Sequence, residues 1–224
     1  VELLAKTAIS HAEAGADVGQ VAAGIINHYY WFDAVAEEGK DKVPSRLHYF
    51  GNEDPGALVN VSGAGNGLET IKVSLDSTTD LPLEVTIGPG VLFQAGSDRT
   101  QNMVTREEKK VALRGRGHTE TVVIEAACVN MHKDMPSPSK TFALGKTPAA
   151  DNLKKLVSYP AFRKQRFRVQ QFAIWTITDN PATRERYMGL GPFIATLPSD
   201  DEMRAIRALF LEAGIPTAEY GALR

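Results

Sequence analysis

The spacing of apolar residues changes near residue 148, and this change constrains the fold more than any other feature of the chain. From about Ala57 to Leu144, apolar and polar residues alternate in short runs that glycine and proline interrupt, as in half-buried β-strands. From about Asn152 to Leu211, apolar residues recur every three or four positions, as on one face of a helix. The sequence therefore predicts a β region followed by a helical region.

Three regions are predicted from this pattern. Because strand runs and helix runs are separated along the chain, we expect an α+β fold rather than alternating βα units. An Ig-like antiparallel β-sandwich should occupy residues 57–147, since short strands with regular turn signals are typical of that architecture. A small helical unit should follow over residues 148–224. Residues 1–56 should hold N-terminal helices, over residues 1–38, and a connector.

Capping signals mark the ends of the predicted helices. Ser199 with Glu202 three residues later has the form of a capping box. Gly214 is suited to end the helix that begins at this capping box. Asn180-Pro181 has the form of an N-cap followed by proline at the first helical position. We therefore expect one helix to begin after Asn180 and the last helix to begin after Ser199.

Composition excludes several classes of protein. Apolar residues make up 43% of the chain and charged residues 23%, as in folded globular proteins rather than disordered ones. No apolar run approaches the roughly 18 residues that a membrane span requires. The single cysteine, Cys128, excludes an internal disulfide. The chain begins with Val1 rather than Met, so we expect it to be a fragment of a longer protein that an upstream signal peptide could precede.

A basic stretch between Lys146 and Arg168 is interleaved with Tyr159, Phe162 and Phe167. Such a pattern can serve single-stranded nucleic acid through phosphate contacts and base stacking. The formal net charge of the whole chain is -2, however, and no nucleic-acid module signature is present. We therefore expect a solvated helix face or an internal contact here, and nucleic acid is disfavoured as a partner.

Neither a cofactor nor a metal is predicted. The glycines of Gly63–Gly67 lack the spacing of a dinucleotide fingerprint and precede a strand rather than a helix, which indicates a β-turn. Cys128 and His132 are four residues apart, but zinc needs three or four protein ligands and no further cluster supplies them. No Gly-x-Ser-x-Gly elbow is present. A hydrolase built on dispersed carboxylates stays open as an alternative, because carboxylate pairing is spatial.

Cys128 and Gln171 are the basis of the most specific chemical hypothesis, an internal thioester. Cys128 ends a predicted strand, and Gln171 begins the stretch Gln171–Trp175 on a predicted helix. Attack of the thiolate on the glutamine amide carbon, with loss of ammonia, would close an internal thioester. The Gln-x-Ala-Ile-Trp stretch and the upstream cysteine resemble the thioester domains of Gram-positive surface adhesins. That resemblance implies a covalent adhesin-type domain, whereas packing of Cys128 as a small buried hydrophobe is the alternative.

A broader resemblance covers about residues 57–220. The segments Pro89–Phe93, Gln101–Val104, Ala127–Asn130 and Gln171–Asn180 are similar to a recurrent, uncharacterised bacterial β-sandwich-plus-helical module. This resemblance implies a fold and says little about activity. It favours an extracytoplasmic bacterial location over a cytoplasmic one.

The function predicted from the sequence is a non-catalytic binding or structural module of a bacterial surface or periplasmic protein. Sandwiches commonly present the loops at their ends for recognition. We expect a protein or surface ligand to contact the turns at 63–67, 94–101 and 115–118. The oligomeric state is left open. The candidate binding residues on these turns are Asn66, Arg99, Gln101, Arg116 and His118.

Overall fold

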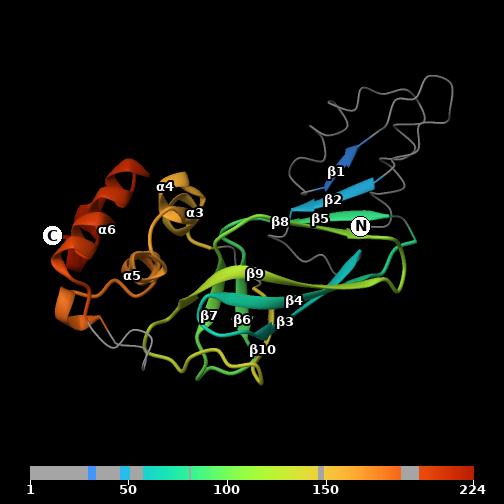
Figure 1. Ribbon diagram of the computed structural model, residues 1–224, viewed down its shortest axis with the longest axis horizontal. Helices are drawn as coiled ribbons and strands as arrows, with labels where there is room; N and C mark the ends of the chain where they lie inside the picture. The colour runs from blue at the N-terminus through green and yellow to red at the C-terminus, as the bar shows by residue number, and fades with distance from the viewer. Residues whose placement is uncertain (1–29, 34–45, 51–57, 81, 146–148, 188–196) are drawn as a thin grey trace. The chain divides into compact units, whose positions relative to one another are not determined.

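A computed structural model describes residues 30–33, 46–50, 58–80, 82–145, 149–187 and 197–224. Its strands form a closed barrel, in the order β10-β3-β4-β9-β7-β6, and a four-stranded sheet in the order β1-β2-β5-β8 (Figure 1). The strands are β1 Tyr30–Asp33, β2 Arg46–Phe50, β3 Val59–Gly65, β4 Thr70–Ser77, β5 Leu83–Ile87, β6 Leu92–Ala95, β7 Asn102–Thr105, β8 Lys109–Leu113, β9 Thr119–Val129 and β10 Thr141–Leu144.

The predicted Ig-like sandwich is wrong, because the strands close into a barrel. β10 pairs with β3 on one side and with β6 on the other, so that Ala143 lies opposite both Ser62 and Gln94. The second sheet also contains a parallel pair, β2 with β5, which a purely antiparallel sandwich lacks. Alternation correctly predicted a β region over residues 57–144, but a period of two does not say which strands pair or whether they close into a barrel.

The predicted N-terminal helices are contradicted where the structure describes that region. Tyr30–Asp33 is strand β1 and pairs antiparallel with β2. Arg46–Phe50, expected in a connector, is strand β2. The rest of residues 1–38 lies outside the described residues. Aromatic residues are frequent in strands as well as in helices, so the Tyr-Tyr-Trp-Phe run did not distinguish the two.

The chain divides into two compact units that are interleaved along the sequence. One comprises Val1–Val61, Ser74–Ile87 and Lys109–Val122, and the other comprises Ser62–Val73, Gly88–Glu108 and Val123–Arg224. We call them the first and the second unit. Strands β3, β4 and β9 each run from one unit into the other.

Helices follow the last strand, within the second unit. Ser199 accepts a hydrogen bond from the Glu202 amide and Glu202 caps the Ser199 amide in return, which confirms the predicted capping box. The predicted N-cap at Asn180 is wrong. Asn180 has a φ of 44°, and its side chain instead binds the backbone of Glu219 and Gly221. The helices are α3 Asp151–Ser158, α4 Pro160–Arg163, α5 Phe167–Thr178 and α6 Asp200–Glu212, with 3-10 turns at Arg184–Arg186, Thr217–Glu219 and Gly221–Leu223.

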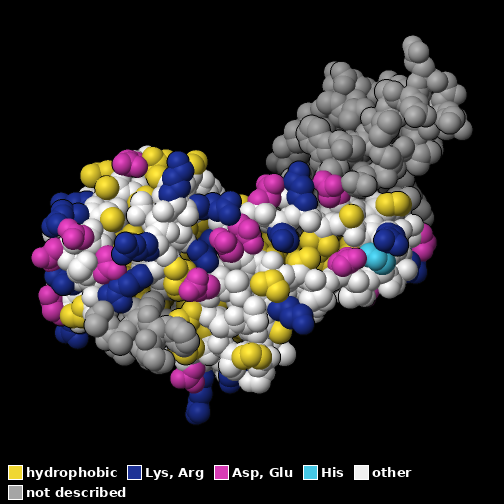
Figure 2. Space-filling view, viewed as in Figure 1, with side chains coloured by type: hydrophobic (Ala, Val, Ile, Leu, Met, Phe, Trp, Pro, Cys, Tyr) yellow, Lys and Arg dark blue, Asp and Glu magenta, His cyan; other side chains and the backbone are white. Residues whose placement is uncertain are grey.

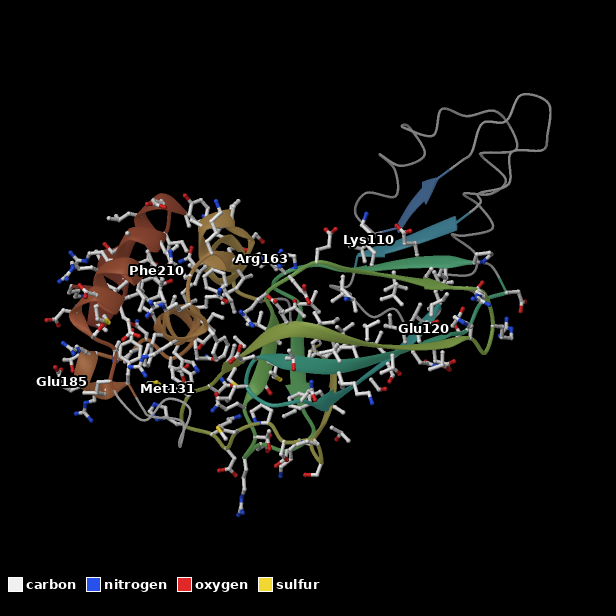
Figure 3. The ribbon with its side chains drawn as sticks, viewed as in Figure 1. Lys110, Glu120, Met131, Arg163, Glu185 and Phe210 are labelled. Carbon is white, nitrogen blue, oxygen red and sulfur yellow. The ribbon has the colours of Figure 1, made fainter. Side chains whose placement is uncertain are left out.

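The core of the second unit joins the helices to the end of β9. Phe172 and Trp175 of α5 are fully buried and pack edge to face, with ring centroids 5.8 Å apart. Phe210 lies on the side of α6 that faces the other helices (Figure 3). Cys128 of β9 belongs to the same buried cluster. The helices therefore stabilise this end of β9 through a shared hydrophobic core.

Candidate functional site

Three connections between strands lie at the same end of the barrel, within the second unit. The end of β3 and the end of β6 both pair with the start of β10, through Ala64 and Ala95. The end of β9 pairs with the start of β7, where Val129 faces Asn102. Residues 65–69, 96–101 and 130–140, which follow or precede these strand ends, therefore gather together. We call these three segments the barrel-end loops.

Backbone contacts tie the barrel-end loops to one another. The Gly65 amide donates to the Lys140 carbonyl at 2.9 Å. A Cβ at Gly65 would lie 2.2 Å from the Ser137 carbonyl oxygen, so only glycine allows this approach. The Asp134 amide donates to the Arg99 carbonyl at 2.7 Å, and the Gln101 amide donates to the Asp134 carbonyl at 2.9 Å. The three segments consequently form one continuous surface.

The exposed side chains of this surface are polar and of both charges. Asn66 and Arg99, predicted as binding residues, are both exposed here. The Asn66 amide nitrogen donates to Thr70 Oγ1 at 2.8 Å. The further exposed polar residues of these loops are Glu69, Asp98, His132, Asp134 and Ser139. None of them was predicted as a binding residue, because only the pairing of β7 with β9 brings residues 130–134 beside Arg99.

Gln101 supports this surface from the inside. Its side chain is fully buried, and Nε2 donates to the Lys133 carbonyl at 2.9 Å. The oxygens Gln101 Oε1, Thr100 Oγ1 and Asn130 Oδ1 are buried without a protein partner, and a buried water commonly binds such oxygens. Gln101 therefore positions the loop 130–134 and does not reach the exterior.

We expect Gln101→Met to lower the free energy of unfolding by about 1–3 kcal/mol, because the Lys133 carbonyl loses its donor. Urea denaturation followed by circular dichroism measures this. Arg99→Ala, on the exposed side of the same loop, is the matched control and should change stability by less than about 0.5 kcal/mol. Equal losses in the two variants would show that Gln101 has no such supporting role.

Arg116 and His118 belong to the first unit, on the turn between β8 and β9. Arg116 Nε lies 2.8 Å from Asp80 Oδ1, and this hydrogen bond and charge hold the pKa of Asp80 below its ordinary value. His118 Nδ1 accepts from the Arg114 amide at 3.3 Å. Arg116 thus binds the connection between β4 and β5, and His118 stabilises its own turn.

Cys128 and Gln171 lie together, with the glutamine amide bound to the backbone of the cysteine. The Cys128 amide donates to Gln171 Oε1 at 3.0 Å, and Gln171 Nε2 donates to the Cys128 carbonyl at 2.6 Å. Both residues are fully buried. The Gln171 amide therefore pairs with the backbone at the end of β9 as a neighbouring strand would. Burial raises the pKa of the Cys128 thiol to about 12.

A buried arginine that sequence reasoning missed lies between the barrel and α5. Arg106 is 5% exposed. It donates from Nε to the Ala126 carbonyl at 2.8 Å, from Nη2 to the Glu69 carbonyl at 3.0 Å, and from Nη1 to Gln170 Oε1. Its guanidinium also lies 4.9 Å from the centroid of the Phe167 ring, a cation–π contact. Desolvation lowers the pKa of Arg106, although nearby glutamates oppose this effect.

The predicted basic stretch is partly neutralised by carboxylates of the same unit. Arg163, labelled in Figure 3, lies 3.8 Å from Glu107 and 3.9 Å from Glu125. Arg168 Nε donates to Glu202 Oε1 at 2.6 Å. On the face shown in Figure 2, basic and acidic side chains are interspersed over the helices. This surface lacks the single-sign field that nucleic-acid binding uses.

Among the described residues, no group of three or more His, Cys, Asp or Glu side chains is placed to hold a metal ion. None of the helices in the described part of the chain has the length and apolar character to cross a membrane.

Comparison with known proteins gives partial similarities to ferric iron-binding proteins. The chain is 45% identical over 49 residues to the Fe(3+)-binding periplasmic protein of Serratia marcescens. It is 46% identical over 46 residues to the major ferric iron-binding protein of Neisseria gonorrhoeae. These matches cover 22% and 20% of the chain, which spans only 14% of each relative's length. No family model and no solved structure matches the chain.

Proposed function

We propose that the chain is an extracytoplasmic, non-catalytic binding module whose barrel-end loops contact the partner. The observation that carries this proposal is the convergence of three loops, tied by backbone hydrogen bonds, that expose polar side chains of both charges. Such a surface is held in place before binding, so it loses little conformational entropy when a partner binds. The partial similarity to a periplasmic binding protein supports the location and the class of function.

Site-specific photocrosslinking tests this proposal. A photoreactive side chain is placed at Arg99 or at His132, within the barrel-end loops, and the full chain is irradiated in intact bacteria. Leu211 of α6, which is 63% exposed, is the matched control position outside these loops. Discrete crosslinked species from Arg99 and His132 but not from Leu211 would support the proposal. Absence of such species, or equal labelling at all three positions, would contradict it.

Ferric iron is a second candidate ligand, and the names of the two relatives favour it. Titration of the full chain with ferric citrate, followed by visible absorbance and by the melting temperature, tests this. Binding at a defined stoichiometry with a rise in melting temperature would support ferric-iron binding. Citrate alone is the control. An unchanged spectrum and an unchanged melting temperature on addition of ferric citrate would exclude ferric-iron binding.

The predicted thioester competes with the hydrogen bonds of Gln171 for the same amide group. Because Cys128 is buried with its pKa raised to about 12, the thiol is protonated at neutral pH and is a poor nucleophile. We expect the intact mass to equal that of the sequence and Cys128 to alkylate only after unfolding. A native mass short by one ammonia, with methylamine adding to Gln171, would establish the thioester and a covalent function.

A further inference from the structure

Asn66 is the only asparagine of the chain that is followed by glycine. Asn66 and Gly67 form the turn between β3 and β4 and are both exposed. Gly67 has a φ of 91°, and nothing lies within 4 Å of the position that a Cβ would occupy. We infer that Asn66 is a site of spontaneous deamidation, which changes the charge of the barrel-end loops.

The reaction needs only water. The backbone nitrogen of Gly67 attacks Cγ of Asn66, so an N–Cγ bond forms and the Cγ–Nδ2 bond breaks. The side-chain nitrogen leaves as ammonia and carries away the proton of the Gly67 amide. Water then opens the five-membered imide at either carbonyl, which gives aspartate or isoaspartate at position 66. A glycine nitrogen attacks readily because no Cβ crowds its approach.

The other asparagines of the described region are less suited to this reaction. Asn60, Asn102, Asn130 and Asn152 are followed by valine, methionine or leucine, whose side chains crowd the attacking nitrogen. Asn102 Oδ1 also accepts from the Ala95 amide at 3.0 Å. Asn180 precedes a proline, which has no N–H to lose. Reactivity should therefore concentrate at Asn66.

Thr70 restrains the reactive amide in the folded chain. Thr70 Oγ1 accepts from Asn66 Nδ2 at 2.8 Å and donates to the Asn66 carbonyl at 3.0 Å. The first of these bonds holds the Asn66 side chain against its own turn, so this bond must break before Cγ can meet the Gly67 nitrogen. Loss of one ordinary hydrogen bond increases the reactive population by about fivefold, and Thr70→Val should accelerate deamidation by about that factor.

The product would alter the surface that we propose for partner binding. A carboxylate at position 66 adds a negative charge and removes the donor to Thr70. Isoaspartate also adds one atom to the backbone of the turn. The deamidation itself does not rest on the proposed function, because its readout is chemical and needs no partner.

Peptide mass spectrometry of the folded full chain, aged at mildly alkaline pH, tests the inference. We expect a time-dependent gain of the mass difference between an amide and an acid, confined to the peptide that contains Asn66, with isoaspartate detected by enzymatic methylation. The gain should be faster in Thr70→Val and absent in Asn66→Gln, which retains an amide but disfavours ring closure. Circular dichroism verifies that both variants fold. No gain at Asn66, or equal gains at Asn102 and Asn152, would overturn the inference.

Discussion

Replacing Arg106 with methionine should lower the free energy of unfolding by about 3–5 kcal/mol, as when one partner of a buried charged network is removed. Methionine has a similar length but no donors, so the carbonyls of Ala126 and Glu69 and the Oε1 of Gln170 would each lose a charged partner. Chemical denaturation measures the loss. The cation–π contact with Phe167 would be lost as well.

Two controls make this result specific to the buried network. Arg163→Ala removes a half-exposed arginine whose nearest carboxylates lie 3.8 and 3.9 Å away, so we expect a loss below about 1 kcal/mol. Arg106→Lys keeps the charge but not the planar set of donors, and should recover only part of the stability. If Arg106→Met cost no more than Arg163→Ala, the network would not hold the barrel and α5 together.

Gln171→Leu should destabilise the chain by about 2–4 kcal/mol, because it leaves the buried amide and carbonyl of Cys128 unpaired. Urea denaturation at neutral pH measures this loss. Gln171→Glu should lose stability progressively as the pH rises above the ordinary pKa of glutamate. Burial would raise the pKa of a carboxyl at this position. The variant therefore keeps its stability while this carboxyl is protonated and loses it as the carboxyl ionises.

Cys128→Ala separates the backbone role of residue 128 from a role of its thiol. The substitution keeps both hydrogen bonds to Gln171, and we expect it to cost only about 1 kcal/mol for the lost sulfur contacts. A thioester would make the two residues act as a unit, so that Cys128→Ala and Gln171→Leu would cause similar losses. Similar losses would therefore contradict the backbone role proposed for Gln171.

Local signals in the sequence were sufficient for two of the helices after residue 148, α3 and α6. The capping box at Ser199 and the apolar spacing around Leu156 each depend on residues within a few positions, and both helices are present. Asn180 shows the limit of such reasoning. Its side chain binds the backbone of Gly221, 41 positions later in the chain. This distant contact, which the local sequence does not show, replaces the N-cap that the local sequence predicts.

The barrel and the candidate site could not be predicted, because both depend on contacts between distant strands. Ser62 and Gln94 each pair with Ala143, and nothing in their local patterns distinguishes closure from an open sandwich. Asn66 and Arg99 were predicted as binding residues on turns; both are exposed, and their role in binding stays a prediction. Gln101 lies just beside them but is buried, because the loop 130–134 covers it.

The position of β10 in the chain has a consequence for synthesis. The barrel cannot close until Thr141–Leu144 has left the ribosome, since β10 alone joins β3 to β6. Until then those two strands present unpaired edges, which are templates for pairing with another chain. A stop shortly before residue 141 should therefore yield an aggregation-prone product, even though most of the barrel strands would already be present.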